Sequence, residues 1–163
     1  MNKIENWINK KCGEIIFDSN IDNWNKSTSV FVSKVMNKNQ LLFLIETTNG
    51  IKFGQYVNTT IDKVDSWISD ENSFLFTFLN QNKPLKFKLK RGESCVFYLY
   101  PKTDDYLFSI SNDIFIYKKG KESKCYDTEY CYFNYEGNKN AIIGGNESPV
   151  SFTPKRILVI QMK

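Results

Sequence analysis

The sequence predicts a mainly β protein in which two antiparallel sheets pack as a β-sandwich, with short flanking helices that include an N-terminal one. Two observations support this class. Many short apolar stretches, separated by turn residues, follow residue 41, and the connections between them are too short for helical crossovers. With 163 residues, of which 41% are hydrophobic and 15% aromatic, the chain is expected to form one domain, residues 1–163.

Two helices are expected before the strands begin. Apolar residues recur at helical spacing within the first twelve positions, at Ile4, Trp7, Ile8 and Cys12. Asn2 is the expected N-cap of this helix and Gly13 its expected end. Residues 27–37 predict a second helix capped by Ser27 or Thr28, and its β-branched residues make packing necessary for its stability.

The strongest strand signal is a hairpin around Asn49-Gly50. The preceding stretch LLFLIETT is apolar at successive positions, which predicts burial on both faces. Asn-Gly fits a type I′ turn with positive φ at both central residues. The following stretch IKFGQYV alternates, with Phe53 and Gln55 on one face and Gly54 and Tyr56 on the other.

Shorter apolar runs predict the remaining strands. They lie at residues 14–17, 73–79, 85–90, 94–100, 105–111, 112–120 and 156–162. The stretch GNKNAIIGGNESP reads as an irregular loop in which Ile142 and Ile143 either contact a partner or fold back onto the core.

Composition gives no positive case for catalysis. The chain has no histidine, so neither a serine triad nor a cysteine–histidine pair can form. The carboxylate pairs Asp70-Glu71 and Asp104-Asp105 are interpreted as exposed loop charges, since adjacent residues point apart in a strand. No phosphate-binding motif occurs, and the four cysteines lack zinc-site spacing. We therefore predict a protein that is not an enzyme and has no cofactor or metal.

No apolar run approaches the length of a membrane span, and the N-terminus lacks the apolar core of a signal peptide. The expected location is the cytoplasm or the nucleus.

The hairpin and the residues after it resemble the TLDc domain family. The similarity consists of a buried strand, a glycine, the pattern F-G-x-Y, a tryptophan, an acidic stretch and S-F-L-F. The matching residues are Leu41 to Ile45, Gly50, Phe53, Gly54, Tyr56, Trp67, Glu71, Ser73, Phe74, Leu75 and Phe76. The second half departs from the family, because DYLFSISNDIFIY lacks the usual glycine-rich segment.

This resemblance implies a fold of two antiparallel sheets and a non-enzymatic interaction domain linked to protection from oxidative stress. It also implies a protein partner, with subunits of the vacuolar proton pump (V-ATPase) as candidates. Gly50 is then a turn residue, and Gly54 allows another backbone or a large ring to approach the strand. We expect Gly54→Val to destabilise the fold.

Two alternative functions remain open from the sequence. The net charge of +4 and the row Lys86, Lys88, Lys90 and Arg91, together with lysines at 118–124 and Tyr130, Tyr132 and Tyr135, would suit a nucleic-acid-binding regulator. The competing interpretation is a solvated strand face that protects a sheet edge. A redox role for Cys125, which follows Lys124, would require a thiol of lowered pKa.

Overall fold

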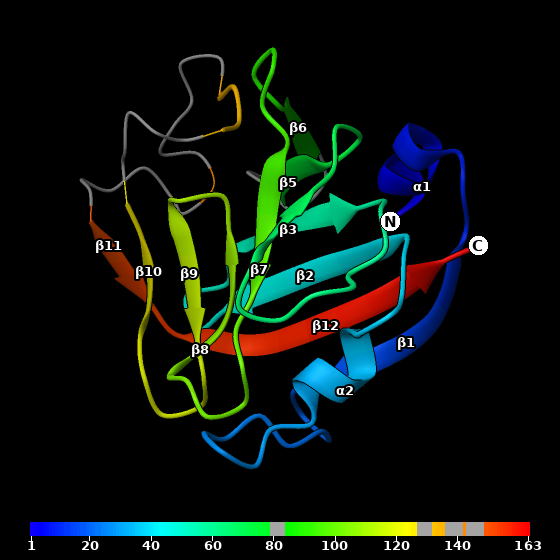
Figure 1. Cartoon of the computed structure of the whole chain (residues 1–163). Helices are drawn as coiled ribbons and strands as arrows, with labels where there is room; N and C mark the ends of the chain where they lie inside the picture. Colours follow the sequence, from blue (N-terminus) through cyan, green and yellow to red (C-terminus); the bar gives the residue numbers. More distant parts are fainter. Residues whose placement is uncertain (79–83, 127–131, 136–141, 143–148) are drawn as a thin grey trace.

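The computed structural model describes residues 1–78, 84–126, 132–135, 142 and 149–163 (Figure 1). Its helices are α1 (Asn2–Ile8) and α2 (Phe31–Val35). Its strands are β1 (Cys12–Asp18), β2 (Leu41–Thr47), β3 (Lys52–Val57), β4 (Trp67–Ser69), β5 (Phe74–Phe78), β6 (Pro84–Lys88), β7 (Cys95–Leu99), β8 (Tyr106–Ile110), β9 (Ile114–Tyr117), β10 (Ser123–Cys125), β11 (Val150–Phe152) and β12 (Pro154–Met162).

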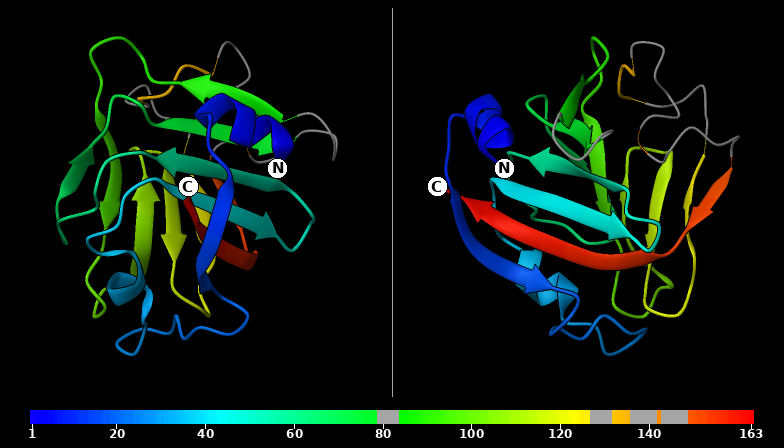
Figure 2. Two further views of the ribbon diagram at one scale, coloured as in Figure 1. Left: turned by 90° about the vertical axis from the view of Figure 1, so that its right-hand side faces the viewer. Right: turned by 180° about the vertical axis from the view of Figure 1, so that it is seen from behind.

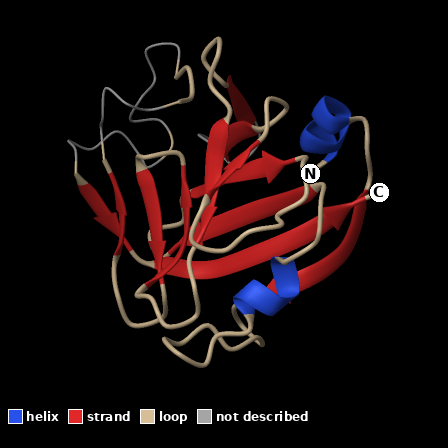
Figure 3. Ribbon diagram, viewed as in Figure 1, coloured by secondary structure: helices blue, strands red, loops and turns tan. Residues whose placement is uncertain are grey.

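The strands form two six-stranded antiparallel sheets, which confirms the predicted fold class (Figure 3). The first sheet has the order β1-β12-β2-β3-β5-β6 and the second has the order β11-β10-β9-β8-β7-β4. The C-terminal strand β12 lies between β1 and β2, so both ends of the chain meet in the first sheet (Figure 2). Ring contacts between Phe43 of the first sheet and Phe97 and Phe108 of the second, at 4.7 and 5.3 Å between centroids, fill the space between the sheets.

Strand β2 is buried on both faces, as its uninterrupted apolar run predicted. Phe43 and Ile45 point into the core between the sheets. Leu42 belongs to a second cluster on the outer face of the first sheet, where Ile4 and Trp7 of α1 cover it. The N-terminal helix α1 therefore covers a small second hydrophobic core on the outer face of the first sheet.

Helix α1 is shorter than the sequence predicted. It ends at Asn9, whose left-handed backbone (φ 56°) closes the helix, and Gly13 instead lies inside β1. The N-cap is Met1, and no side chain caps the helix. The carboxylate of Glu5 accepts the Cys12 N–H at 2.9 Å and so helps to turn the chain into β1. Asparagine tolerates the left-handed region well enough to end a helix in place of glycine.

Helix α2 has five residues, and the predicted caps Ser27 and Thr28 do not serve it. The Phe31 N–H instead donates to Ser29 Oγ at 3.1 Å. Ser27 has a left-handed backbone (φ 65°), which excludes it from the helix. The helix is held by burial of Phe31 and Val35, consistent with the weak helix propensity of its β-branched residues.

The β2–β3 hairpin is present, but its predicted type I′ turn is wrong. Gly50 has positive φ (88°), whereas Asn49 does not. The Thr47 N–H donates to Ile51 O at 2.9 Å and the Gly50 N–H donates to Thr47 O at 3.0 Å, so three residues form the loop. Such loops place a glycine in the left-handed region at their last position.

The sequence reading missed three strands, β4, β10 and β11, each of three residues. A segment of that length is too short to show a period of two, and its partner strands decide its pairing. Strand β6 ends at Lys88, so it stops two residues before the expected end.

Candidate interaction site

The predicted motif residues form the scaffold of the first sheet. Gly54 lies opposite Phe76 of β5, and a Cβ at this position would come within 1.9 Å of Phe43 O. Ser73 donates its hydroxyl to Tyr56 O at 2.8 Å and accepts from Gln55 Nε2 at 2.9 Å, which ties β3 to the start of β5.

The other motif residues lie around this centre. Phe53 and Phe74 are buried on opposite faces of the first sheet, Gly50 and Glu71 are exposed in turns, and Trp67 is partly buried on the second sheet. Most of the motif therefore serves as a framework, while Glu71, Ser73 and Phe74 also line a pocket of about 280 Å³ beside Lys86 and Lys88.

The interpretation of Asp70-Glu71 as a pair of exposed loop charges is wrong for Asp70. Only 5% of Asp70 is exposed. Its carboxylate accepts backbone N–H groups from Asn58, Thr59 and Asn72, the last two at 3.3 and 3.0 Å. Asp70 thus joins the segment after β3 to the turn before β5, a role that the sequence reading missed because it depends on which backbone groups approach the carboxylate.

The predicted basic row divides into packed and free side chains. The Lys86 ammonium lies 4.1 Å from the centroid of Phe74 and 5.7 Å from that of Trp7, and burial, followed by repulsion from Lys88, lowers its pKa. Lys88, Lys90 and Arg91 are exposed.

The structure brings only part of the other predicted nucleic-acid contacts to the basic row: the Lys90 N–H donates to Tyr132 O and the Asn134 N–H donates to Lys88 O, each at 2.8 Å. Lys118 is 2% exposed and donates to the carbonyl oxygens of Pro101 and Asp104. The Tyr135 hydroxyl donates to Asp113, whereas Tyr132 accepts from Asn112, and Tyr130 lies outside the described residues. Lys118 is therefore a buried structural group, whereas the segment that carries Tyr132 pairs with the basic row.

Ile142 and Cys125 both belong to the core. They are 1% and 8% exposed, so neither presents a broad surface to a partner or oxidant. Ile143 and Cys131 lie outside the described residues. The binding role of the isoleucines and the redox role of Cys125 stay predictions.

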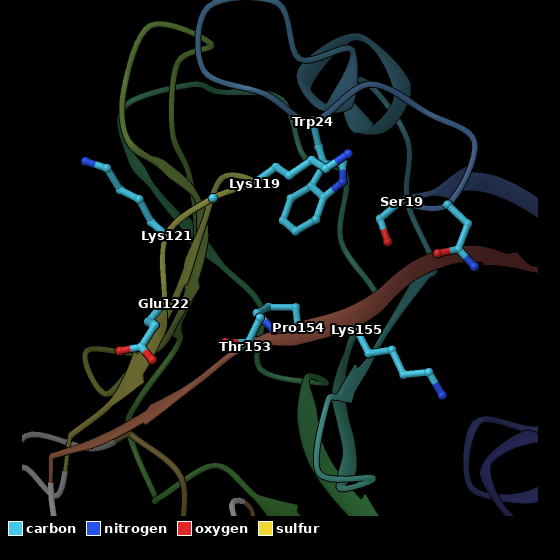
Figure 4. A pocket seen from close by; sticks show the side chains of 10 residues that line it. Ser19, Trp24, Lys119, Lys121, Glu122, Thr153, Pro154 and Lys155 are labelled. Atoms are coloured by element: carbon cyan, nitrogen blue, oxygen red, sulfur yellow. The ribbon is translucent and has the colours of Figure 1, made fainter.

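A pocket of about 510 Å³ lies where three distant segments of the chain meet (Figure 4). The segment after β1 contributes Ser19, Asn20 and Trp24, the β9–β10 turn contributes residues 119–122, and the start of β12 contributes residues 153–155. The indole of Trp24, 8% exposed, lies close to the Lys119 side chain, with Pro154 across the hollow.

Backbone hydrogen bonds hold these segments in place. The Lys119 N–H donates to Trp24 O at 3.3 Å, which fixes the turn against the N-terminal segment. The Ile157 N–H donates to Ser19 Oγ at 2.8 Å, and the Ser19 N–H donates to Ile157 O at 3.0 Å. The pocket is therefore preformed.

Lysines dominate the charge around this pocket. Lys121 and Lys155 extend to opposite sides of the hollow (Figure 4), where they pair with Asp105 at 2.6 Å and Glu46 at 2.8 Å. Lys26 also pairs with Asp105 at 2.8 Å, and the two ammonium groups lower the pKa of Asp105 to about 2. No ion pair of Lys119 occurs among the described residues, and the lining contains three lysines and one glutamate, Glu122.

An exposed apolar residue stands in the same segment as the indole. Ile21 is 84% exposed, the highest value among the large hydrophobic residues described. A preformed hollow, an exposed isoleucine and a free ammonium group are features of a binding surface. The sequence analysis missed it, although Trp24 within the polar stretch SNIDNWNKS was a signal that could have found it.

The lining residues offer apolar, hydrogen-bonding and charged groups. The hydroxyl of Ser19 is engaged with the backbone of β12, and the pocket contains neither cysteine nor histidine. In the described parts of the chain, no three cysteine, aspartate or glutamate side chains gather in a way that could hold a metal ion. No helix in those parts is long and apolar enough to span a membrane.

The fold and the pocket define a β-sandwich domain with a preformed binding surface. Residues 2–103 match the TLDc domain family, and the chain belongs to that family. The TLDc family is linked to oxidative stress and to protein interaction, and its domains are generally non-catalytic. No curated protein matches the chain significantly. The match contains Trp24 and Ile21, whereas the other two pocket segments lie beyond residue 103.

Proposed function

We propose that this TLDc domain is a non-enzymatic interaction module in protection from oxidative stress, acting in the cytoplasm through subunits of the vacuolar proton pump. Family membership supports the class of function. The observation that carries the choice of surface is the Trp24 pocket, whose N-terminal segment also carries the exposed Ile21 next to Asn20 of the lining.

The partner segment that fits this surface is acidic and carries an apolar anchor. An apolar side chain can pack against Ile21 and the Trp24 ring, while a carboxylate can reach the ammonium group of Lys119. Buried apolar anchors provide most of the affinity in such interfaces, and rim charges mainly raise the association rate and set its salt dependence.

An affinity pull-down from cell extract, with and without nuclease, tests the proposal. The tagged chain should retain proton-pump subunits after nuclease treatment, as identified by mass spectrometry. Ile21→Asp and Lys119→Glu should reduce this recovery, because they remove the apolar anchor and reverse the charge at the pocket. Lys88→Glu is the matched control, since it makes the same charge change on β6 of the first sheet.

Two outcomes contradict the proposal. Recovery of the subunits that is unchanged by both pocket variants would exclude this surface. Partners that are lost on nuclease treatment, together with a loss caused by Lys88→Glu, would instead favour the nucleic-acid-binding alternative.

A further inference from the structure

A row of aromatic side chains crosses the outer face of the second sheet. Trp67 of β4 lies opposite Tyr98 of β7 in register, and Tyr100, Tyr106 and Tyr117 continue the row onto β8 and β9. All five side chains are only partly buried. The described helices do not lie on this face, because α1 packs on the first sheet and α2 contacts β1. The row is therefore accessible to small solutes.

Successive rings in the row are in contact. The centroid distances are 5.2 Å from Trp67 to Tyr98, 4.6 Å from Tyr98 to Tyr100, 4.8 Å from Tyr100 to Tyr106 and 4.3 Å from Tyr106 to Tyr117. All four lie in the shorter half of the distances of ordinary aromatic pairs or below them. Because electronic coupling falls steeply with distance, such contacts allow an electron to pass from ring to ring.

Tyr98 also has a proton acceptor in place. Its hydroxyl donates to Asp65 Oδ1 at 2.9 Å, and the Asp65 N–H donates to Leu99 O at 2.9 Å, which anchors the carboxylate to β7. Burial, followed by this hydrogen bond to Asp65, raises the pKa of Tyr98 to about 12. The phenol is therefore neutral at neutral pH, so its oxidation must release a proton, and the carboxylate is positioned to accept it.

We propose that this row of rings carries one-electron oxidising equivalents across the second sheet, with Trp67 as the entry point and Tyr98, paired with Asp65, as the first relay. A small oxidising radical, such as the azide radical, takes one electron from Trp67 and becomes an anion, while the indole proton passes to water. The Trp67 radical then takes one electron from Tyr98 and a proton from water, and the phenolic proton of Tyr98 moves to Asp65.

Later steps repeat this exchange along the row. The Tyr98 radical regains an electron from Tyr100 and its proton from Asp65, while the phenolic proton of Tyr100 passes to water. The radical then moves through Tyr106 to Tyr117, and each restored tyrosine takes its proton from water as the next one releases its own. At the end of the row, a hydrogen-atom donor such as ascorbate restores the last tyrosine and becomes the ascorbyl radical. One oxidising equivalent thus crosses the face without net change in the protein.

Pulse radiolysis of the purified full chain with azide radical tests this relay. Absorption of the tryptophan radical should decay as absorption of the tyrosyl radical rises, in a first-order phase whose rate does not depend on protein concentration. Tyr98→Phe keeps the ring and removes only the hydroxyl, so this phase should be lost while the melting temperature stays near that of the wild type. Asp65→Asn should slow the phase because the proton acceptor is weaker.

Two further variants make the assignment specific. Trp67→Phe should also abolish the phase, which separates Trp67 from Trp7 and Trp24. Tyr56→Phe removes a tyrosine on the outer face of the first sheet and should leave the phase unchanged. A Tyr98→Phe protein with wild-type kinetics, or a transfer rate that rises with protein concentration, would overturn the proposal. The test contains no other protein, so its result is independent of the partner proposed above.

Discussion

Substitution of Gly54 by alanine tests how closely β2 and β3 approach each other. A Cβ on Gly54 would lie 1.9 Å from Phe43 O and 2.6 Å from Phe76 Cζ. The carbonyl cannot move away without disturbing β2, which is paired with β3 on one side and β12 on the other. Overpacking of a buried site costs about 1–3 kcal/mol, and the fixed backbone oxygen places Gly54→Ala near the upper end, about 3 kcal/mol.

Urea unfolding followed by tryptophan fluorescence, together with thermal unfolding, measures this loss. For a chain of this size, a decrease of about 3 kcal/mol corresponds to a melting temperature lower by about 6–12 °C. Gly54→Val should cost more, because two further methyl groups enter the same contact. Lys52→Ala, at an exposed position of β3, is the control and should stay within about 0.5 kcal/mol of the wild type. A Gly54→Ala protein as stable as this control would refute the reasoning.

Three further predictions concern polar and charged groups. Asp70→Ala should lower the free energy of unfolding by about 2 kcal/mol in urea, because three backbone N–H groups lose their buried acceptor, whereas Glu71→Ala should change it by less than about 0.5 kcal/mol. Hydrogen bonds from Arg156 of β12 lower the pKa of Asp18 in the folded protein. The ionised carboxylate therefore stabilises the fold fully above about pH 4, and this stabilisation is lost as the pH falls through the lowered pKa of the folded state. When the urea unfolding midpoint is measured at decreasing pH, the wild type should lose its stability advantage over Asp18→Asn. A difference between the two midpoints that stays constant down to acid pH would contradict this. Lys86→Ala should cost about 0.5–1 kcal/mol through its lost ring contacts, and an effect no larger than that of Lys88→Ala would show that those contacts contribute nothing.

The local pattern of apolar and polar residues was sufficient to predict the central strands of the first sheet. The apolar run of β2 predicted a strand buried on both faces, and the alternation after Gly50 placed Phe53 and Tyr56 on opposite faces correctly. These features depend on side-chain period and on turn residues, which neighbouring positions fix. Turn type was harder to predict, because Asn49 proved not to have positive φ.

Several features depended on contacts between distant segments. Lys118 is buried because the carbonyl oxygens of Pro101 and Asp104 accept its ammonium protons, and its own neighbours in sequence give no sign of this. The helix ends were also not predicted correctly, because Asn9 closes α1 with a left-handed backbone and Ser29 accepts the N–H of Phe31, the first residue of α2.

The fold class, the hairpin and the close approach at Gly54 follow from the amino-acid pattern, since hydrophobic period and glycine placement act over a few residues. The Trp24 pocket and the aromatic row arise only when the chain is folded. The pocket joins residues 19–24, 119–122 and 153–155, and the row joins strands β4, β7, β8 and β9. Such sites depend on strand order and register, which are set by the packing of the whole sandwich.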